Sequence, residues 1–178
     1  MTMHAASSHA PPMPDLNTLD PRYEIQAYVG SGATSHVWRG QDLEGGSPIA
    51  IKVMKVGEDP EPFSLECSLL ERWAAVEAAA DDGMEVIPRL LASDLETRKP
   101  YLVTDFVTGQ KVSDMLWDAD LIDEKLALTI GWQFYRVLHL LHSELQRSYT
   151  DMKLDNIWWD GEAGQIWVPD WNGLSEEE

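Results

Sequence analysis

The sequence predicts an α+β fold in which a small antiparallel sheet carrying one helix precedes a long helix and a β-hairpin. Strand-like segments joined by glycine-containing turns lie near the start of the chain. Two later stretches place apolar residues at the spacing of an α-helix, and tryptophan-rich segments follow the second stretch. Because the strand-rich and helix-rich parts are segregated along the chain, the pattern favours an α+β fold.

The composition allows a packed core and restricts the partners. The 178 residues suit one domain or one small two-lobed unit, and 44% of them are hydrophobic. Lys and Arg number 13 against 31 Asp and Glu, which gives a formal net charge of −18. This balance argues against binding of nucleic acid or of anionic membranes, because both attract basic residues. A basic protein partner is compatible with it.

Compartment signals are sparse. Cys67 is the single cysteine, so no intramolecular disulfide can form, which fits a reducing compartment. Residues 1–14 have neither the basic start nor the apolar run of a signal peptide. No stretch approaches the roughly 20 apolar residues of a membrane helix. We therefore expect a cytoplasmic protein.

The first part of the chain predicts a leader and a three-stranded meander. Residues 1–20 are rich in Ala, Ser, His and Pro and are interpreted as a flexible leader. Strands are expected at Tyr23–Val29, His36–Gln41 and Ile49–Val56. Gly45–Pro48 is the turn between the last two strands. Because consecutive strands are joined by tight turns, the meander is antiparallel.

Helical periodicity marks two further elements. Pro62–Ala80 is predicted to be a helix, with a proline near its start and Gly83 past its end. Leu121–His142 is predicted to be the longest helix. The expected buried stripes are Phe63, Cys67, Leu70 and Ala74 in the first helix, and Leu126, Ile130, Phe134, Val137, Leu138 and Leu141 in the second.

Short apolar segments predict the remaining strands. Tyr101–Thr104 is expected to be a strand between the two helices. After the second helix, Ile157–Trp159 and Gln165–Val168 flank Asp160-Gly161, which is typical of a hairpin.

The first chemical feature combines a glycine-rich loop with a lysine. Gly30-Ser31-Gly32 lies between two strands, where glycines let backbone N–H groups approach a phosphate without a Cβ in the way. A plain glycine turn is the alternative. Lys52 lies on the third strand, 22 residues after Gly30, where a two-strand return brings it below the loop. An ammonium there can hold phosphate oxygens, whereas a surface lysine is the alternative.

Glu66 is the second chemical feature. It follows Phe63 by three residues, so helical geometry puts its carboxylate on the apolar stripe. A carboxylate that faces a core needs a partner, and Lys52 is the obvious cation. Glu71 is a rival position nearer the flank of the helix, and a solvated glutamate is the other alternative.

Two polar segments complete the set. The segment after the long helix offers an aspartate that can accept a hydroxyl proton, a lysine that can reach a phosphoryl group and an asparagine that can bind a metal. These are Asp151, Lys153 and Asn156. Asp170 follows the hairpin, at the end of a strand, where it can hold Mg²⁺ across phosphates. Ordinary Asp- and Asn-rich turns are the alternative for both segments.

With these motifs in this order, residues 22–173 resemble the protein kinase family, in the form of a bacterial-type Ser/Thr kinase. The segment Pro100–Gly109 looks like the last sheet strand and the hinge, with Thr104 as gatekeeper. The resemblance implies ATP and Mg²⁺ as ligands. It assigns Asp151 and Lys153 to catalysis, Asn156 and Asp170 to the metal, and the nucleotide to Gly30, Gly32, Val37, Ala50, Lys52, Glu66, Thr104 and the backbones of Asp105 and Val107.

The resemblance also implies an organisation and an activity. Residues 21–105 would form the N-terminal lobe, 106–110 the hinge, and 111–178 a shortened C-terminal lobe with the long helix, the catalytic loop and the hairpin. The implied reaction is phosphoryl transfer from Mg·ATP to a hydroxyl, with a Ser or Thr of a protein substrate following from the family alone. A small-molecule hydroxyl is the other possibility.

Three departures from the family pattern keep a second function open. Ser35 stands at the third glycine, Tyr149-Thr150 replaces the usual His-Arg, and Trp171-Asn172 replaces the usual Phe-Gly. Loss of that arginine suggests a chain that is not switched by activation-loop phosphorylation. The alternative is a pseudokinase, a module that binds nucleotide or a partner protein without turnover.

The chain is also short beside a kinase. Only five residues follow Gly173, where a kinase continues through an activation segment and several helices. We expect either a fragment of a longer polypeptide or a reduced kinase completed by a partner protein. The apolar face of the long helix would then be partly bare, which predicts association through the C-terminal lobe.

Overall fold

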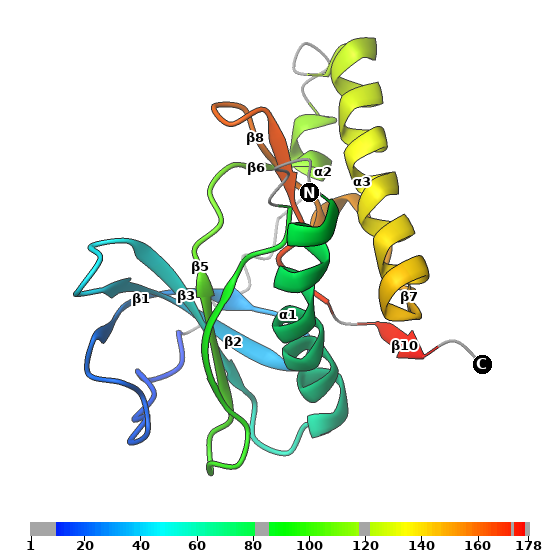
Figure 1. The fold of residues 1–178 in the computed structure, drawn as a ribbon. Coiled ribbons are helices and arrows are strands. Elements are labelled where there is room, and N and C mark those ends of the chain that lie inside the picture. The colour runs from blue at the N-terminus through cyan, green and yellow to red at the C-terminus, as the bar shows by residue number, and fades with distance from the viewer. Residues whose placement is uncertain (1–9, 81–85, 118–121, 172, 177–178) are drawn as a thin grey trace, which may run out of the picture.

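The computed structural model describes residues 10–80, 86–117, 122–171 and 173–176. The main sheet has five strands. Figure 1 shows helix α1 (Pro60–Ala80) beside this sheet, and helix α3 (Glu124–Leu145) with a small hairpin in the other half of the molecule. This arrangement confirms the predicted α+β fold. None of the described helices is both long enough and apolar enough to cross a membrane.

The main sheet has the strand order β1-β2-β3-β5-β4, and every neighbouring pair is antiparallel. The predicted meander is present, and the predicted strand before the hinge is β5. The fifth strand, β4, was not predicted from its sequence. The strands are β1 (Tyr23–Ser31), β2 (Ser35–Asp42), β3 (Pro48–Met54), β4 (Leu90–Asp94) and β5 (Tyr101–Asp105).

The outer face of the sheet has its own apolar core. Ile49 and Ile51 of β3 are fully buried there together with Trp38 of β2. Leu16 and Leu19 from the leader pack against this cluster, and Tyr101 Oη donates a hydrogen bond to the backbone oxygen of Thr18 at 3.0 Å. The second half of the expected flexible leader is therefore anchored by burial of its leucines, whereas residues 1–9 lie outside the described part.

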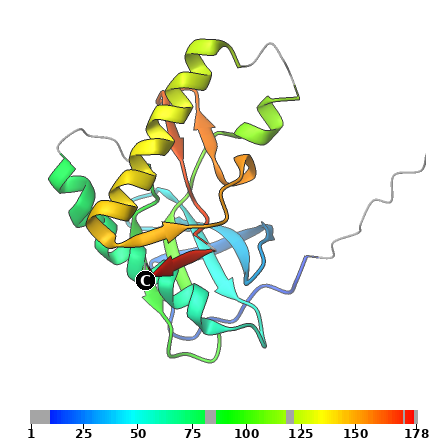
Figure 2. The same cartoon turned by 90° about the vertical axis from the view of Figure 1, so that its right-hand side faces the viewer.

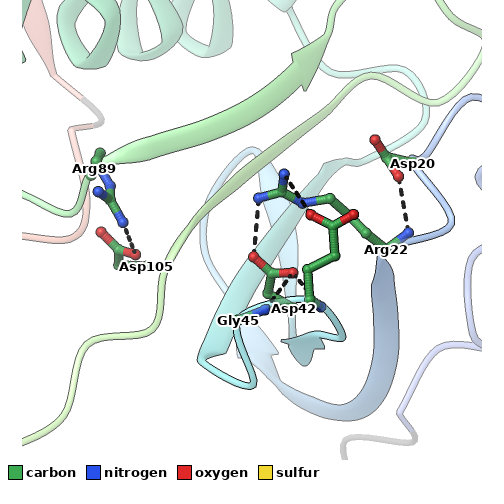
Figure 3. Close-up of polar contacts among 7 residues, drawn as sticks. Asp20, Arg22, Asp42, Gly45, Arg89 and Asp105 are labelled. Atoms are coloured by element: carbon green, nitrogen blue, oxygen red, sulfur yellow. Dashed lines mark hydrogen bonds and ion pairs between the residues drawn. The ribbon is translucent and has the colours of Figure 1, made fainter.

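An ionic cluster closes the β2–β3 turn against the start of β1 (Figure 3). Arg22 Nη2 donates to Asp42 Oδ2 at 3.0 Å, and Arg22 Nη1 lies 3.7 Å from Glu44 Oε2. Asp42 Oδ1 also accepts hydrogen bonds from the backbone N–H groups of Glu44 and Gly45. Burial would raise the pKa of Asp42, but these backbone hydrogen bonds and Arg22 outweigh it and lower the pKa.

Helix α1 spans Pro60–Ala80, starting two residues before the predicted boundary. Phe63, Cys67 and Leu70 are buried as the periodicity predicts. Ala74 is exposed, so the predicted stripe is wrong at its last position, and Trp73 is buried in its place. The buried face also includes Glu66, Leu70 and Trp73, which are spaced i, i+4 and i+7, so it is centred to one side of the predicted stripe. The large indole of Trp73 fills the core there better than the methyl group of Ala74 would. Gly83 lies outside the described residues.

Helix α3 spans Glu124–Leu145 rather than Leu121–His142. The Oδ1 atom of Asp123 accepts a hydrogen bond from Leu126 N at 2.7 Å, so Asp123 is the N-cap that sets the start. Gln146 adopts a left-handed conformation, with φ at 53°, and ends the helix. The predicted apolar face is confirmed: Ile130, Val137 and Leu141 are buried, and Leu126, Phe134 and Leu138 pack against them. Residue 121 lies outside the described part.

Short elements follow the sheet and α3 and hold the polar loops. The predicted hairpin is β8 (Trp158–Asp160) with β9 (Gln165–Trp167), and β6 (Gln110–Lys111) adds a third strand beside β8. Figure 2 shows β10 (Leu174–Glu176) alongside β7 (Arg147–Tyr149), just beyond the end of α3. These remaining elements are α2 (Val112–Met115), β7 (Arg147–Tyr149), the 3₁₀ turn η1 (Leu154–Asn156) and β10 (Leu174–Glu176).

The solvent-facing side of α3 carries exposed aromatic residues. Trp132 is 62% exposed and Tyr135 is 54% exposed, and their rings stack with centroids 5.6 Å apart. Tyr135 also stacks on His139 at 6.0 Å. Association through this part of the chain stays a prediction.

Candidate functional site

Strand register gathers the predicted nucleotide residues on one face of the sheet. Gly30 of β1 is paired with Val37 of β2, and Val37 is paired with Lys52 of β3. Ala50 is paired with Thr104 of β5. Directly paired residues in an antiparallel sheet, and residues two apart along one strand, point to the same side. Val37, Ala50, Lys52 and Thr104 therefore share the face opposite the outer core.

Lys52 and Glu66 form a buried ion pair between β3 and α1. The Nζ atom of Lys52 donates to Oε1 of Glu66, and both residues are less than a tenth exposed. Lys52 Nζ also donates to the backbone oxygen of Pro169 at 2.8 Å. The contact with Glu66 is the pairing that the helical spacing predicts. The contact with Pro169 brings the segment that carries Asp170 to the same ammonium.

The charges around Lys52 keep it protonated. Burial lowers the pKa of Lys52, but the negative charges of Glu66 and then Asp170 outweigh burial and raise it above the ordinary value. Burial raises the pKa of Glu66, and the neighbouring Lys52 opposes that shift. A lysine held among acidic groups stays cationic, which an anion-binding role requires.

The predicted catalytic loop folds around Asp151. Lys153 Nζ donates to Asp151 Oδ2 at 2.6 Å, and Asn156 Nδ2 donates to the same oxygen at 3.1 Å and to the Asp151 backbone oxygen at 3.0 Å. The hydrogen bond from Lys153 is the main reason that the pKa of Asp151 lies below its ordinary value. At neutral pH the carboxylate is therefore ionised and able to accept a proton.

Tyr149 connects this loop to the segment after the hairpin. Asn156 Nδ2 donates to the Tyr149 hydroxyl at 2.7 Å, and that hydroxyl donates to the backbone oxygen of Asp170 at 3.1 Å. The Tyr149 ring lies 5.1 Å from the buried ring of Trp171. Burial raises the pKa of Tyr149 well above its ordinary value, so the hydroxyl remains a donor. One phenol therefore binds both residues that were predicted to hold a metal.

A close backbone approach fixes Asp151 against Gly173. Thr150 N and Thr150 Oγ1 donate to the Gly173 backbone oxygen at 2.9 and 2.7 Å. Gly173 has φ at 89°, and a Cβ atom there would lie 3.0 Å from the Cβ of Asp151. Glycine adopts this φ without strain, whereas a residue with a Cβ would be strained and would crowd Asp151. Asn172, the other member of the predicted motif, lies outside the described residues.

The predicted hinge follows β5 directly. Thr104 is buried, and its hydroxyl donates to the Asp105 backbone oxygen at 3.2 Å. Arg89 Nη2 donates to Asp105 Oδ1 at 3.4 Å, as Figure 3 shows, and Asp105 N donates to the Arg89 backbone oxygen. The Asp105 side chain therefore forms its ion pair with Arg89, just before the start of β4. Val107 lies two residues further on, between β5 and β6.

The glycine loop is held by a residue that the sequence patterns did not indicate. Lys55 Nζ donates to the backbone oxygens of Gly32 at 2.6 Å and Ala33 at 3.0 Å. Lys55 N donates to the Thr34 oxygen, and Gly32 N donates to the Ser35 oxygen, both at 2.9 Å. A Cβ atom placed at Gly30 would meet no atom of the described residues within 4 Å, so crowding does not exclude a side chain there.

The oxygen atoms of Asn156 and Asp170 are suitable ligands for magnesium. The described residues contain no group of three or more His, Cys, Asp or Glu side chains able to hold a metal ion. Magnesium favours oxygen ligands and is usually bound by one or two protein groups together with phosphates and water. The carboxylate of Asp170 and the amide oxygen of Asn156 are of the right chemical type.

Sequence reasoning missed three groups of the candidate site: the Tyr149 hydroxyl, the Lys55 ammonium and the Pro169 carbonyl. Tyr149 was noted only as a departure from a motif. For Lys55, strand alternation beyond Lys52 was the available signal, because the two lysines are separated by an odd number of positions. No sequence signal points to the Pro169 carbonyl, which lies 117 residues from Lys52.

Comparison with known proteins agrees with this geometry. The protein kinase domain model matches residues 23–177. The serine/threonine-protein kinase PknL of Mycobacterium tuberculosis is 32% identical over 105 residues, which cover 55% of this chain and 24% of PknL. PknA of the same organism is 27% identical over 146 residues, which cover 79% of this chain and 32% of PknA.

A third relative comes from another genus. The serine/threonine-protein kinase drp72 of Corynebacterium efficiens is 28% identical over 145 residues, which cover 78% of this chain and 27% of drp72. The chain thus spans about a quarter to a third of the length of the curated relatives it matches.

Proposed function

Because the chain belongs to the protein kinase family, we propose that it binds Mg·ATP on the Lys52 face of the sheet and supports phosphoryl transfer to a hydroxyl. The observation that carries this proposal is the position of Lys52. Its ammonium contacts Glu66 of α1 and the Pro169 carbonyl, one residue before Asp170. A cation held between the sheet and the Asp170 segment is suited to phosphate oxygens.

The sheet and the hinge supply the proposed nucleotide contacts. The backbones of Asp105 and Val107 bond adenine, with Thr104 beside it and Val37 and Ala50 against its faces. Gly30 and Gly32 place the glycine loop over the phosphates, and Lys52, fixed by Glu66, binds them. The shared face of Val37, Ala50, Lys52 and Thr104 supports this assignment.

Asn156 and Asp170 are the proposed metal residues. Mg²⁺, when bound, neutralises charge that develops on the phosphates. Tyr149 supports this role because its hydroxyl bonds the Asn156 amide and the Asp170 backbone. The Asn156 amide nitrogen donates to protein acceptors, which leaves its oxygen as the atom to face a cation.

Asp151 is the proposed proton acceptor. As the substrate oxygen forms its bond to the transferred phosphorus and the bond to the leaving phosphate oxygen breaks, the hydroxyl proton passes to the Asp151 carboxylate. Lys153 keeps that carboxylate ionised in the resting protein and offers its ammonium to the transferred group. The proposed substrate is a Ser or Thr of a protein.

The second candidate is a pseudokinase module that binds nucleotide or a partner protein without turnover. Thr150 favours it, because Thr150 occupies the position of the family's arginine and bonds the Gly173 carbonyl. The division into a leader (1–20), N-terminal lobe (21–105), hinge (106–110) and C-terminal lobe (111–178) is common to both candidates.

Two measurements on the 178-residue chain test these candidates. Thermal unfolding with and without Mg·ATP tests binding, because a ligand selective for the folded state raises the Tm. Transfer of radiolabelled phosphate to a mixture of Ser- and Thr-containing peptides and to the chain itself tests turnover. We expect a Tm increase with Mg·ATP and a transfer activity that Asp151→Asn removes.

The matched control is Asp155→Asn, which removes a neighbouring exposed carboxylate and should leave transfer intact. If Mg·ATP raises the Tm but Asp151→Asn transfers as much phosphate as the wild type, or neither transfers any, the result supports the pseudokinase. An unchanged Tm with Mg·ATP, together with no transfer, overturns the phosphotransferase and the nucleotide-binding form of the pseudokinase, and leaves only a module that binds a partner protein.

A further inference from the structure

Lys55 lies on the opposite side of the sheet from Lys52. Side chains alternate along a strand, and β3 ends at Met54, one residue before Lys55. Val53 belongs to the outer core, whereas Met54 packs against the inner core, so alternation places Lys55 on the outer side. His36 is paired with Val53, and Lys55 contributes to lowering the pKa of His36 after the larger effect of burial.

From this side the Lys55 ammonium donates hydrogen bonds to two consecutive backbone carbonyl groups. Lys55 Nζ lies 2.6 Å from the Gly32 oxygen and 3.0 Å from the Ala33 oxygen. Hydrogen bonds from an ionised donor are stronger than neutral ones, so two of them on one turn restrain the loop. The backbone of Lys55 adds a third restraint through the Thr34 oxygen at 2.9 Å.

The orientation of these carbonyls fixes the orientation of the next N–H groups. In a planar trans peptide the C=O and N–H bonds point in opposite directions. The carbonyls of Gly32 and Ala33 point to Lys55, so the N–H groups of Ala33 and Thr34 point away from it. Because Lys55 lies on the outer side of the sheet, we infer that these N–H groups are directed toward the opposite side, which carries Lys52. Successive N–H groups that point the same way form an anion-binding surface.

We propose that Lys55 is a positioning residue for phosphate: it holds the glycine loop by its carbonyls from outside the sheet, so that the loop N–H groups face a nucleotide phosphate. This role rests on the proposed nucleotide-binding function. The two lysines then have different roles: Lys52 binds phosphate directly, and Lys55 orients the loop that binds it.

The test compares Lys55→Met with Lys55→Arg in the full chain. Titration calorimetry with Mg·AMP-PNP and with adenosine separates phosphate binding from binding of the base. For Lys55→Met we expect the Kd for Mg·AMP-PNP to rise about tenfold, while the Kd for adenosine stays within about twofold. Lys55→Arg keeps a charged donor and should restore most of the affinity. Lys125→Met, an exposed lysine of α3, is the charge-matched control and should bind like the wild type.

Hydrogen exchange in the absence of nucleotide provides a second readout. Amide exchange in residues 31–36 should be faster in Lys55→Met than in the wild type and in Lys125→Met. Equal exchange and equal Kd in Lys55→Met and the wild type overturn the proposal, as does an equal loss of affinity for adenosine and Mg·AMP-PNP. If the wild type binds neither ligand, the proposed function and the phosphate role both fail. Faster exchange would then show only that Lys55 restrains the loop.

Discussion

The amide of Asn156 donates to the hydroxyl of Tyr149 at 2.7 Å, and through this phenol it is linked to the backbone of Asp170. Two loops that are distant in sequence thus share one buried oxygen. The link is electrically neutral and remains so at physiological pH, because burial raises the pKa of Tyr149. The relative placement of the proposed metal residues therefore depends on a hydroxyl group.

Tyr149→Phe tests this link. The ring still packs on Trp171, but the Asp170 carbonyl loses its donor and Asn156 keeps only its acceptors on Asp151. We expect the free energy of unfolding, measured with urea, to fall by about 1–2 kcal/mol. The Mg²⁺ concentration needed for half-maximal nucleotide binding should rise. An unchanged Mg²⁺ requirement would show that the hydroxyl stabilises the fold without positioning the metal residues.

Removal of either partner of the buried ion pair should have unequal effects. Lys52→Met leaves Glu66 buried beside the charge of Asp170, whereas Glu66→Gln leaves Lys52 with Asp170 and the Pro169 carbonyl. We expect Lys52→Met to lower the free energy of unfolding by about 3–5 kcal/mol and Glu66→Gln by less. Urea unfolding of both variants and of the double variant Lys52→Met/Glu66→Gln gives the interaction free energy between the two side chains. The double variant should be more stable than Lys52→Met alone, and a lower stability contradicts the explanation.

The Asp42 cluster predicts how stability depends on pH. The pKa of Asp42 is lower in the folded chain than its ordinary value of 3.8, so ionised Asp42 stabilises the fold above that value. As the pH falls below 3.8 and through the folded pKa, this contribution is lost. Asp42→Asn should therefore lower the Tm at neutral pH, and its difference from the wild type should shrink in this acidic range.

Calorimetric scans at a series of pH values check this prediction. Asp15→Asn is the control, because it removes an exposed carboxylate of the leader with the same change in charge. The Tm difference between Asp42→Asn and the wild type could instead stay constant down to the lowest pH of the series. In that case the loss of stability would come from packing of the turn and not from ionisation of Asp42.

Two glycines should respond to alanine in opposite directions. Gly173→Ala forces a residue with a Cβ into a positive φ and against Asp151, so we expect a loss of at least about 1–2 kcal/mol in unfolding free energy. Gly131 is exposed within α3, and no atom of the described residues outside its own helix backbone lies within 4 Å of a Cβ placed there. Gly131→Ala should stabilise the chain by up to about 1 kcal/mol, because alanine favours the helix. Equal effects of the two changes in a urea titration would rule out this account.

Local patterns predicted those parts of the molecule in which short-range spacing decides the structure. The period of a helix was enough to place Glu66 on the buried side of α1, and desolvation of a carboxylate was enough to indicate Lys52 as its partner. The same periodicity failed at Ala74 because the buried face is centred nearer to Glu66, Leu70 and Trp73. It failed at the start of α3 because the Asp123 side chain caps the helix one residue before Glu124.

Contacts between distant segments were beyond such patterns. β4 is a half-buried edge strand with mixed residues, so its pairing with β5 gives little periodic signal. The hydrogen bonds of Tyr149 and of Lys52 to the Asp170 segment depend on how the hairpin returns to the sheet. Sequence spacing indicated which residues have suitable chemistry, but the geometry that joins them comes from the tertiary fold.

The packing of the leader has a practical consequence for the choice of domain boundaries. The family match begins at residue 23, but Leu16 and Leu19 cover apolar side chains of the sheet's outer face. An expression fragment cut at the family boundary would uncover this surface and remove the Thr18 carbonyl that accepts from Tyr101. Such a fragment should be more prone to aggregate than one beginning near residue 10, although every residue of the candidate site would still be present.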